Sequence, residues 1–65
     1  MIVEIYPVGK CVPMTTVECD KWEVDFTKVP RLICYKGNGV SYAIEWERVA
    51  EFFLNNIAGF KEIRG

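Results

Sequence analysis

The stretch RLICYKGNGVSYAIEW, residues 31–46, constrains the fold of this chain more than any other segment. An Asn-Gly pair between two runs of alternating bulky residues is a strong hairpin signal, because a type I′ turn needs a positive φ at both central positions. We therefore predict a β-hairpin that turns at Asn38 and Gly39. A two-residue turn at Gly37-Asn38 would preserve the same faces, whereas a three-residue loop would scramble them.

This register gives the hairpin one apolar face and one mixed face. Residues that lie opposite each other in an antiparallel pair share a face, so Tyr35 is expected to face Tyr42. The face predicted to be buried consists of Ile33, Tyr35, Val40, Tyr42, Ile44 and Trp46. The other face consists of Leu32, Cys34, Lys36, Ser41, Ala43 and Glu45.

A second alternating pattern lies in TTVECDKWEVDF, residues 15–26, where the apolar positions change from odd to even across Asp20 and Lys21. Either a two-residue turn or a bulge in one long strand would produce this change. The turn is slightly favoured because it pairs Cys19 with Trp22. It also places two acidic residues opposite each other, which is unfavourable.

After the hairpin the apolar spacing changes from two residues to three or four, which predicts an amphipathic helix near the C-terminus. The stripe consists of Trp46, Val49, Ala50, Phe53, Leu54 and Ile57. The first eight residues are β-prone, with Pro7 limiting the strand or placing it at an edge. We therefore expect one α+β domain over residues 1–65, in which the helix packs on a mainly antiparallel sheet of about four or five strands.

The composition restricts the chemistry. The chain has no histidine, which removes the commonest general base and metal ligand. The net charge is −1 and no basic stripe is present, which disfavours nucleic-acid binding because phosphate neutralisation dominates that affinity. The start of the chain does not resemble a signal peptide, and its apolar runs are much shorter than the roughly 20 residues of a membrane span. We expect a cytoplasmic protein without a membrane segment.

The three cysteines, Cys11, Cys19 and Cys34, lack the CxxC spacing of zinc sites, and their odd number fits a reducing compartment. Cys19 and Cys34 fall in strand patterns, where a free cysteine behaves as a small buried hydrophobe. Cys11 lies in a Pro/Gly-rich segment and is the candidate for a reactive thiol. The GNG sequence is too short for a phosphate-binding loop. We expect no metal, no cofactor and no catalytic site.

The remaining hypotheses concern binding. Phe52 lies toward the flank of the predicted helix, and surplus apolar area on a small protein marks a partner surface. The acidic residues could face a basic partner, or could simply be the solvent side of a strand pair; they are Glu18, Asp20, Glu23 and Asp25. The leading interpretation is a non-enzymatic protein-interaction module that binds or inhibits a protein partner or self-associates.

Two alternatives belong to other classes of protein. A small nucleic-acid-binding protein would use an aromatic sheet surface made of Arg31, Tyr35, Lys36 and Tyr42. An enzyme would need carboxylate or thiol chemistry, for which the sequence shows no specific motif.

Overall fold

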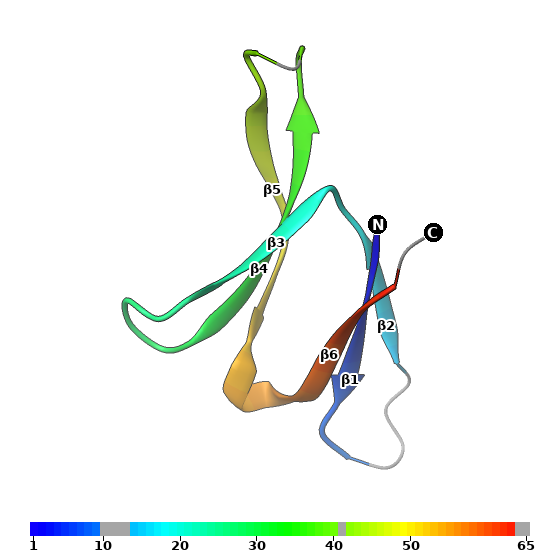
Figure 1. Ribbon diagram of the computed structural model, residues 1–65. Helices are drawn as coiled ribbons and strands as arrows, with labels where there is room; N and C mark the ends of the chain where they lie inside the picture. The colour runs from blue at the N-terminus through cyan, green and yellow to red at the C-terminus, as the bar shows by residue number, and fades with distance from the viewer. Residues whose placement is uncertain (10–13, 41, 64–65) are drawn as a thin grey trace.

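The structure is a computed structural model that describes residues 1–9, 14–40 and 42–63. These residues form two three-stranded antiparallel sheets and one 3-10 turn (Figure 1). The first sheet has the strand order β2–β1–β6, with strands β1 (Ile2–Pro7), β2 (Thr15–Glu18) and β6 (Ile57–Ile63). The second sheet has the order β3–β4–β5, with strands β3 (Lys21–Asp25), β4 (Arg31–Asn38) and β5 (Glu45–Phe53). The 3-10 turn, η1 (Leu54–Asn56), leads from β5 to β6.

The predicted C-terminal helix is wrong, and so is the α+β class, because the described residues contain no α-helix. Residues 46–57 instead form most of β5, all of η1 and the first residue of β6. On β5 the side chains that pack against the core are Ala50 and Phe52, two positions apart as a strand requires. Val49 and Phe53, which belonged to the helical stripe, are exposed. Val, Trp and Phe also favour strands when one face can be buried.

β4 and β5 form the predicted antiparallel hairpin, but the connection between them is longer than predicted. The last paired residues are Asn38 and Glu45, so residues 39–44 connect the strands. Gly39 has a φ of 107°, whereas Asn38 belongs to β4 and no described non-glycine residue has a positive φ. The type I′ turn at Asn38-Gly39 is therefore wrong.

The predicted faces of β4 are largely exchanged in the structure. Tyr35 faces Arg48, and the register of β4 against β5 shifts by one residue between Cys34 and Tyr35. The side of β4 that faces the core carries Leu32 and Cys34, which were expected on the mixed face. Of the set predicted to be buried, Ile33 is buried, Tyr35 is half-buried and the other four are exposed.

β2 and β3 do not pair with each other, so the slightly favoured turn between Cys19 and Trp22 is wrong. The backbone N–H of Cys19 donates to the carbonyl of Met1 at 3.0 Å, in the first sheet. The N–H of Asp20 donates to the carbonyl of Tyr35 at 2.8 Å, in the second sheet. Cys19 and Asp20 thus form a corner at which the chain passes from one sheet to the other. The change of apolar phase arises because the core lies on a different side of the chain after this corner.

The core lies between the two sheets and takes residues from both of them. Its fully buried cluster consists of Val3, Ile5, Cys19, Leu32 and Cys34. Partly buried side chains pack around this cluster, among them Trp22 of β3 and Phe60 of β6. The indole N–H of Trp22 also donates to Glu62 Oε1 at 3.0 Å, so that β3 and β6 are joined by apolar and polar contacts. The sheets leave one end of the β4–β5 hairpin outside this core.

Candidate interaction surface

The distal half of the β4–β5 hairpin projects beyond the two sheets (Figure 1). β3 begins opposite Tyr35, so beyond that residue β4 pairs with β5 alone. We call residues 36–40 and 42–47 the arm. The molecule extends 43 Å along its longest axis and 14 Å along its shortest. A two-stranded ribbon is only marginally stable in water on its own, so the arm depends on contacts along its faces.

One such contact is the packing of Trp46 over its register partner, Gly37. A Cβ atom added at Gly37 would lie 3.1 Å from the Trp46 ring and 3.1 Å from Cγ2 of Ile44. The missing side chain therefore gives Trp46 and Ile44 room to lie together on one face of the arm. The N–H of Gly37 donates to Asp20 Oδ2 at 2.8 Å, which ties the base of the arm to the sheet-switching corner.

Lys21, the first residue of β3, packs against the same face. Its Nζ lies 4.3 Å from the centroid of the Trp46 ring and 5.0 Å from that of the Tyr35 ring. A cation over an aromatic face is attracted by the ring quadrupole. The ammonium group of Lys21 thus lies within cation–π distance of both rings.

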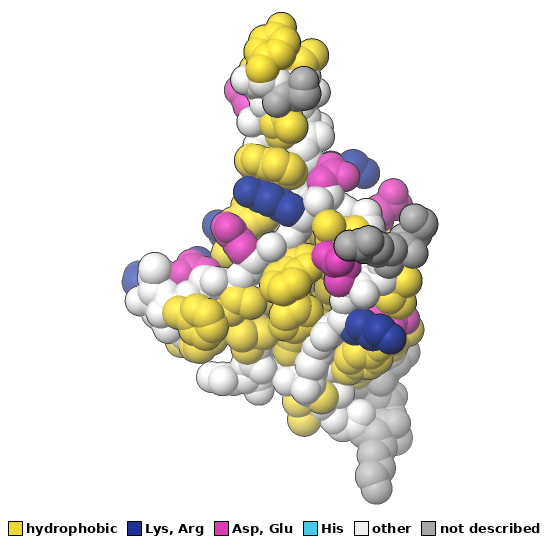
Figure 2. Space-filling view, viewed as in Figure 1, with side chains coloured by type: hydrophobic (Ala, Val, Ile, Leu, Met, Phe, Trp, Pro, Cys, Tyr) yellow, Lys and Arg dark blue, Asp and Glu magenta, His cyan; other side chains and the backbone are white. Residues whose placement is uncertain are grey.

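Between its base and its tip the arm carries four large apolar side chains that are exposed. Their exposed fractions are 52% for Val40, 91% for Tyr42, 41% for Ile44 and 43% for Trp46. Figure 2 shows hydrophobic side chains gathered at the end of the arm. Scattered exposed hydrophobic residues are common, whereas a group of exposed apolar side chains is typical of surfaces that contact a partner. We call these four residues the arm surface.

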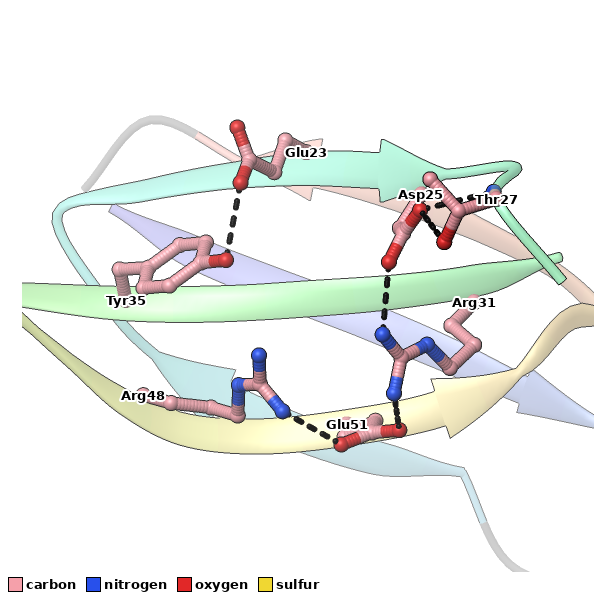
Figure 3. A network of polar contacts seen from close by, with 7 residues as sticks. All are labelled: Glu23, Asp25, Thr27, Arg31, Tyr35, Arg48 and Glu51. Carbon is pink, nitrogen blue, oxygen red and sulfur yellow. Dashed lines mark hydrogen bonds and ion pairs between the residues drawn. The ribbon is translucent and has the colours of Figure 1, made fainter.

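Below the arm, the outer face of the second sheet is covered by a polar network (Figure 3). The Arg31 guanidinium bonds to Asp25 Oδ2 at 2.6 Å and to Glu51 Oε1 at 2.7 Å. Arg48 reaches the other oxygen of Glu51 at 3.1 Å. Ile33 faces Glu51 across the β4–β5 ladder and is only 2% exposed, although it points away from the core. The network joins β3, β4 and β5 and shields this outward isoleucine.

The network also sets the ionisation of its members. The Arg31 guanidinium, followed by the backbone N–H and the hydroxyl of Thr27, lowers the pKa of Asp25 well below its usual value. The hydroxyl of Tyr35 donates to Glu23 Oε1 at 2.8 Å, and this bond raises the pKa of Tyr35. The carboxylates of Asp25 and Glu23 thus act as hydrogen-bond acceptors within the protein.

The four acidic residues of the predicted basic-partner surface are divided between β2, the sheet-switching corner and β3. Glu18 lies on β2 in the first sheet, opposite Ile2. The other three accept hydrogen bonds within the protein: Asp20 from Gly37, Glu23 from Tyr35, and Asp25 from Arg31 and Thr27. The second sheet uses them to fix its own strands.

The four residues of the nucleic-acid alternative do not share a face either. Arg31 is held between two carboxylates, and Tyr35 is hydrogen-bonded to Glu23. Lys36 follows Tyr35 on a strand and so points to the opposite face of the sheet. Tyr42 lies at the exposed tip of the arm.

Phe52, the apolar candidate for partner binding, is half-buried and packs against the core. Its neighbour Phe53 is exposed and lines a shallow pocket of about 270 Å³ with Thr27, Lys28, Val29 and Arg31. Cys11 and Ser41 lie outside the described residues.

Within the described residues, no three His, Cys, Asp or Glu side chains are grouped so that they could hold a metal ion. The same residues form no helix of the length and hydrophobicity needed to cross a membrane. No family model, curated protein or solved structure matches this chain.

The four residues of the arm surface belong to the face of the hairpin that the sequence predicts to be buried, and they are exposed in the structure. One signal in the sequence could have indicated otherwise: Gly37 falls in the middle of the face that was predicted to be the core. A glycine there leaves a gap in a packed core, whereas on an outward face it gives a neighbouring ring a place to lie. Trp46 uses Gly37 in this second way.

Proposed function

We propose that this protein is a non-enzymatic interaction module that binds a partner protein through the arm surface. The observation that carries the proposal is the exposure of Tyr42, Ile44 and Trp46 on a ribbon that projects from the folded body. Trp and Tyr are the residues most often found as hot spots of protein interfaces.

The packing at the base of the arm supports the same proposal. Trp46 packs over the backbone of Gly37 and lies 4.3 Å from the ammonium group of Lys21, and both contacts favour one orientation of the ring in the free protein. An ordered anchor loses less conformational entropy on binding than a free one. We expect a partner with an apolar recess that accepts this ring and the exposed Tyr42.

The nucleic-acid alternative has weaker support. Arg31 and Arg48 share the carboxylate of Glu51, and Arg31 also binds Asp25. Because these charges are already paired, binding phosphate would break existing contacts. Lys21, which lies beside the Trp46 ring, packs on two rings.

The test is affinity capture from the cytosol of the native host with three baits. These are the unchanged protein, the double variant Tyr42→Ser with Ile44→Ser, and the control Phe26→Ser, which alters an exposed aromatic residue outside the arm. Loss of a hot-spot contact costs about 2 kcal/mol or more, which is a loss of affinity of about thirtyfold or more. We expect one set of partners to be retained by the unchanged protein and the control and lost by the arm variant. Equal retention by all three baits would rule out the arm surface.

Two solution measurements test for self-association and for nucleic-acid binding. Sedimentation of the unchanged protein over a range of concentrations detects self-association, which the arm variant should abolish if copies meet through their arms. A gel shift with single-stranded oligonucleotide at low salt tests the nucleic-acid alternative. A salt-sensitive shift would favour that alternative over protein binding.

A further inference from the structure

Two thiols lie together in the core, in a place that the arm surface does not involve. Cys19 is 1% exposed and Cys34 is 0% exposed, and both are free cysteines in the same buried cluster. Cys19 belongs to the sheet-switching corner, and Cys34 to the middle of β4. The hydrogen bond from the N–H of Asp20 to the carbonyl of Tyr35, 2.8 Å long, brings the residues that follow each cysteine side by side.

The buried position of Cys34 also affects its ionisation. Burial is the main cause that raises the pKa of its thiol to about 12, and the neighbouring Cys19 adds to the shift through its charge and through a hydrogen bond between the side chains. Both thiols thus belong to one small buried cluster, beside the hydrogen bond that joins the corner to β4. No metal-binding group of three His, Cys, Asp or Glu side chains includes them among the described residues.

We infer that Cys19 and Cys34 are a latent disulfide pair, which an external disulfide such as oxidised glutathione converts into a bond between the corner and β4. The thiolate of Cys19 attacks one sulfur of glutathione disulfide, forms a mixed disulfide and releases one glutathione thiolate. Cys34, after losing its proton, attacks the Cys19 sulfur and displaces the second glutathione. Two cysteine thiols lose two electrons and two protons, and the external disulfide becomes two thiols.

The reaction requires an opening of the core, because the thiolate is the reactive form and both thiols are buried. The corner is the part that opens with least disruption. Cys19 lies just beyond the end of β2, where the ladder of the first sheet ends, whereas Cys34 is covered by strands on both sides. Ends of ladders open more readily than their centres. Exchange therefore begins at Cys19, and oxidation is fastest while the chain is refolding.

The bond has a predictable effect on stability. It closes a loop that contains all of β3 and the β3–β4 connection. Cross-linking a loop of about 15 residues restricts the unfolded chain and, in a domain this small, raises the Tm by on the order of 10 °C. Because the bond would lie in the core, reductants would reach it only when the corner opens.

The test refolds the unchanged protein from denaturant in a mixture of reduced and oxidised glutathione, and in parallel in reducing buffer. Free thiols are then alkylated under denaturing conditions, and the protein is digested and analysed by mass spectrometry. We expect a monomeric species that has lost two hydrogen atoms, a peptide pair joined through Cys19 and Cys34, and a Tm higher than that of the reduced protein. The variant Cys11→Ser, which leaves only these two thiols, should give the same linked pair.

Three results would overturn the inference: alkylation of both Cys19 and Cys34 after oxidative refolding, bonds made mainly to Cys11 or between chains, or a linked species with a lower Tm than the reduced protein. The decisive measurement uses the unchanged chain, so it does not depend on whether a core variant folds. Binding of partners through the arm is not part of the readout.

Discussion

The ring of Trp22 meets the ring of Phe60 edge-on, with 5.0 Å between the ring centroids and 74° between the ring planes. Trp22 lies on β3 and Phe60 on β6, so this pair joins the two sheets. Edge-to-face aromatic pairs contribute about 0.5–1.5 kcal/mol beyond the area that they bury. The pair adds to the small buried cluster that lies between the sheets.

Phe60→Leu should therefore lower the free energy of unfolding by about 2 kcal/mol, since it removes the aromatic pair and part of the buried area. Urea denaturation followed by circular dichroism measures the change. The matched control is Phe26→Leu, the same substitution at an exposed residue, which should change stability by about 0.5 kcal/mol or less. Equal losses from the two variants would show that the Trp22–Phe60 pair does not join the sheets as described.

The helix predicted over residues 46–57 shows that the spacing of apolar residues alone did not distinguish a helix from a strand here. Trp46, Val49 and Phe53 fit a helical stripe, but they are exposed side chains of β5. The β5 side chains that face the core, Ala50 and Phe52, are spaced by two. Exposed apolar residues fill the gaps in a period-two pattern and make it resemble a longer period. Only the pairing of β5 with β4, a long-range contact, separates the two readings.

The hairpin was predictable as an element, but its register was not. The positive φ expected at Gly39 is present, and residues 39–44 form an even-numbered connection, as the side-chain parity required. The extra residues in the connection and the bulge beside Tyr35 have no local signature. Parity fixes which residues of the hairpin share a face, but it does not say which of the two faces meets the first sheet. The candidate site was missed for that reason.

A pair of glycine substitutions tests the tip of the arm. A Cβ at Gly39 would lie 2.6 Å from the carbonyl oxygen of Ala43, and its φ of 107° is unfavourable for any other residue. Gly39→Ala should lower the free energy of unfolding by about 1–3 kcal/mol. Gly59→Ala, on β6, meets nothing within 4 Å and should be neutral or slightly stabilising. Urea midpoints compare the two, and a neutral Gly39→Ala would contradict the described turn.

The Asp25–Arg31 pair predicts a dependence of stability on pH. The folded protein lowers the pKa of Asp25 below its ordinary value of 3.8, so the unfolded chain takes up the proton first as the pH falls. The stabilisation is complete above about pH 4 and is lost in more acidic solution. Asp25→Asn should be less stable than the unchanged protein at pH 7, and this difference should shrink as the pH falls below 4. Urea denaturation at several pH values measures it, and a difference that stays constant down to pH 2 would contradict the role of Asp25.

The contact between Lys21 and Trp46 should be measurable as an energetic coupling. Lys21→Met keeps most of the apolar stem and removes the charge, while Trp46→Leu removes the ring. If the ammonium group is held by the ring 4.3 Å away, the two changes should not be additive, and their coupling should be about 0.5–1 kcal/mol. A double-mutant cycle from urea denaturation gives this value. The cycle of Lys21→Met with Tyr42→Leu is the matched control: Tyr42 is almost fully exposed, so its coupling should be close to zero. Additive effects in the first cycle would mean that Lys21 does not hold Trp46, and binding through the arm would then have to order this ring at the moment of contact.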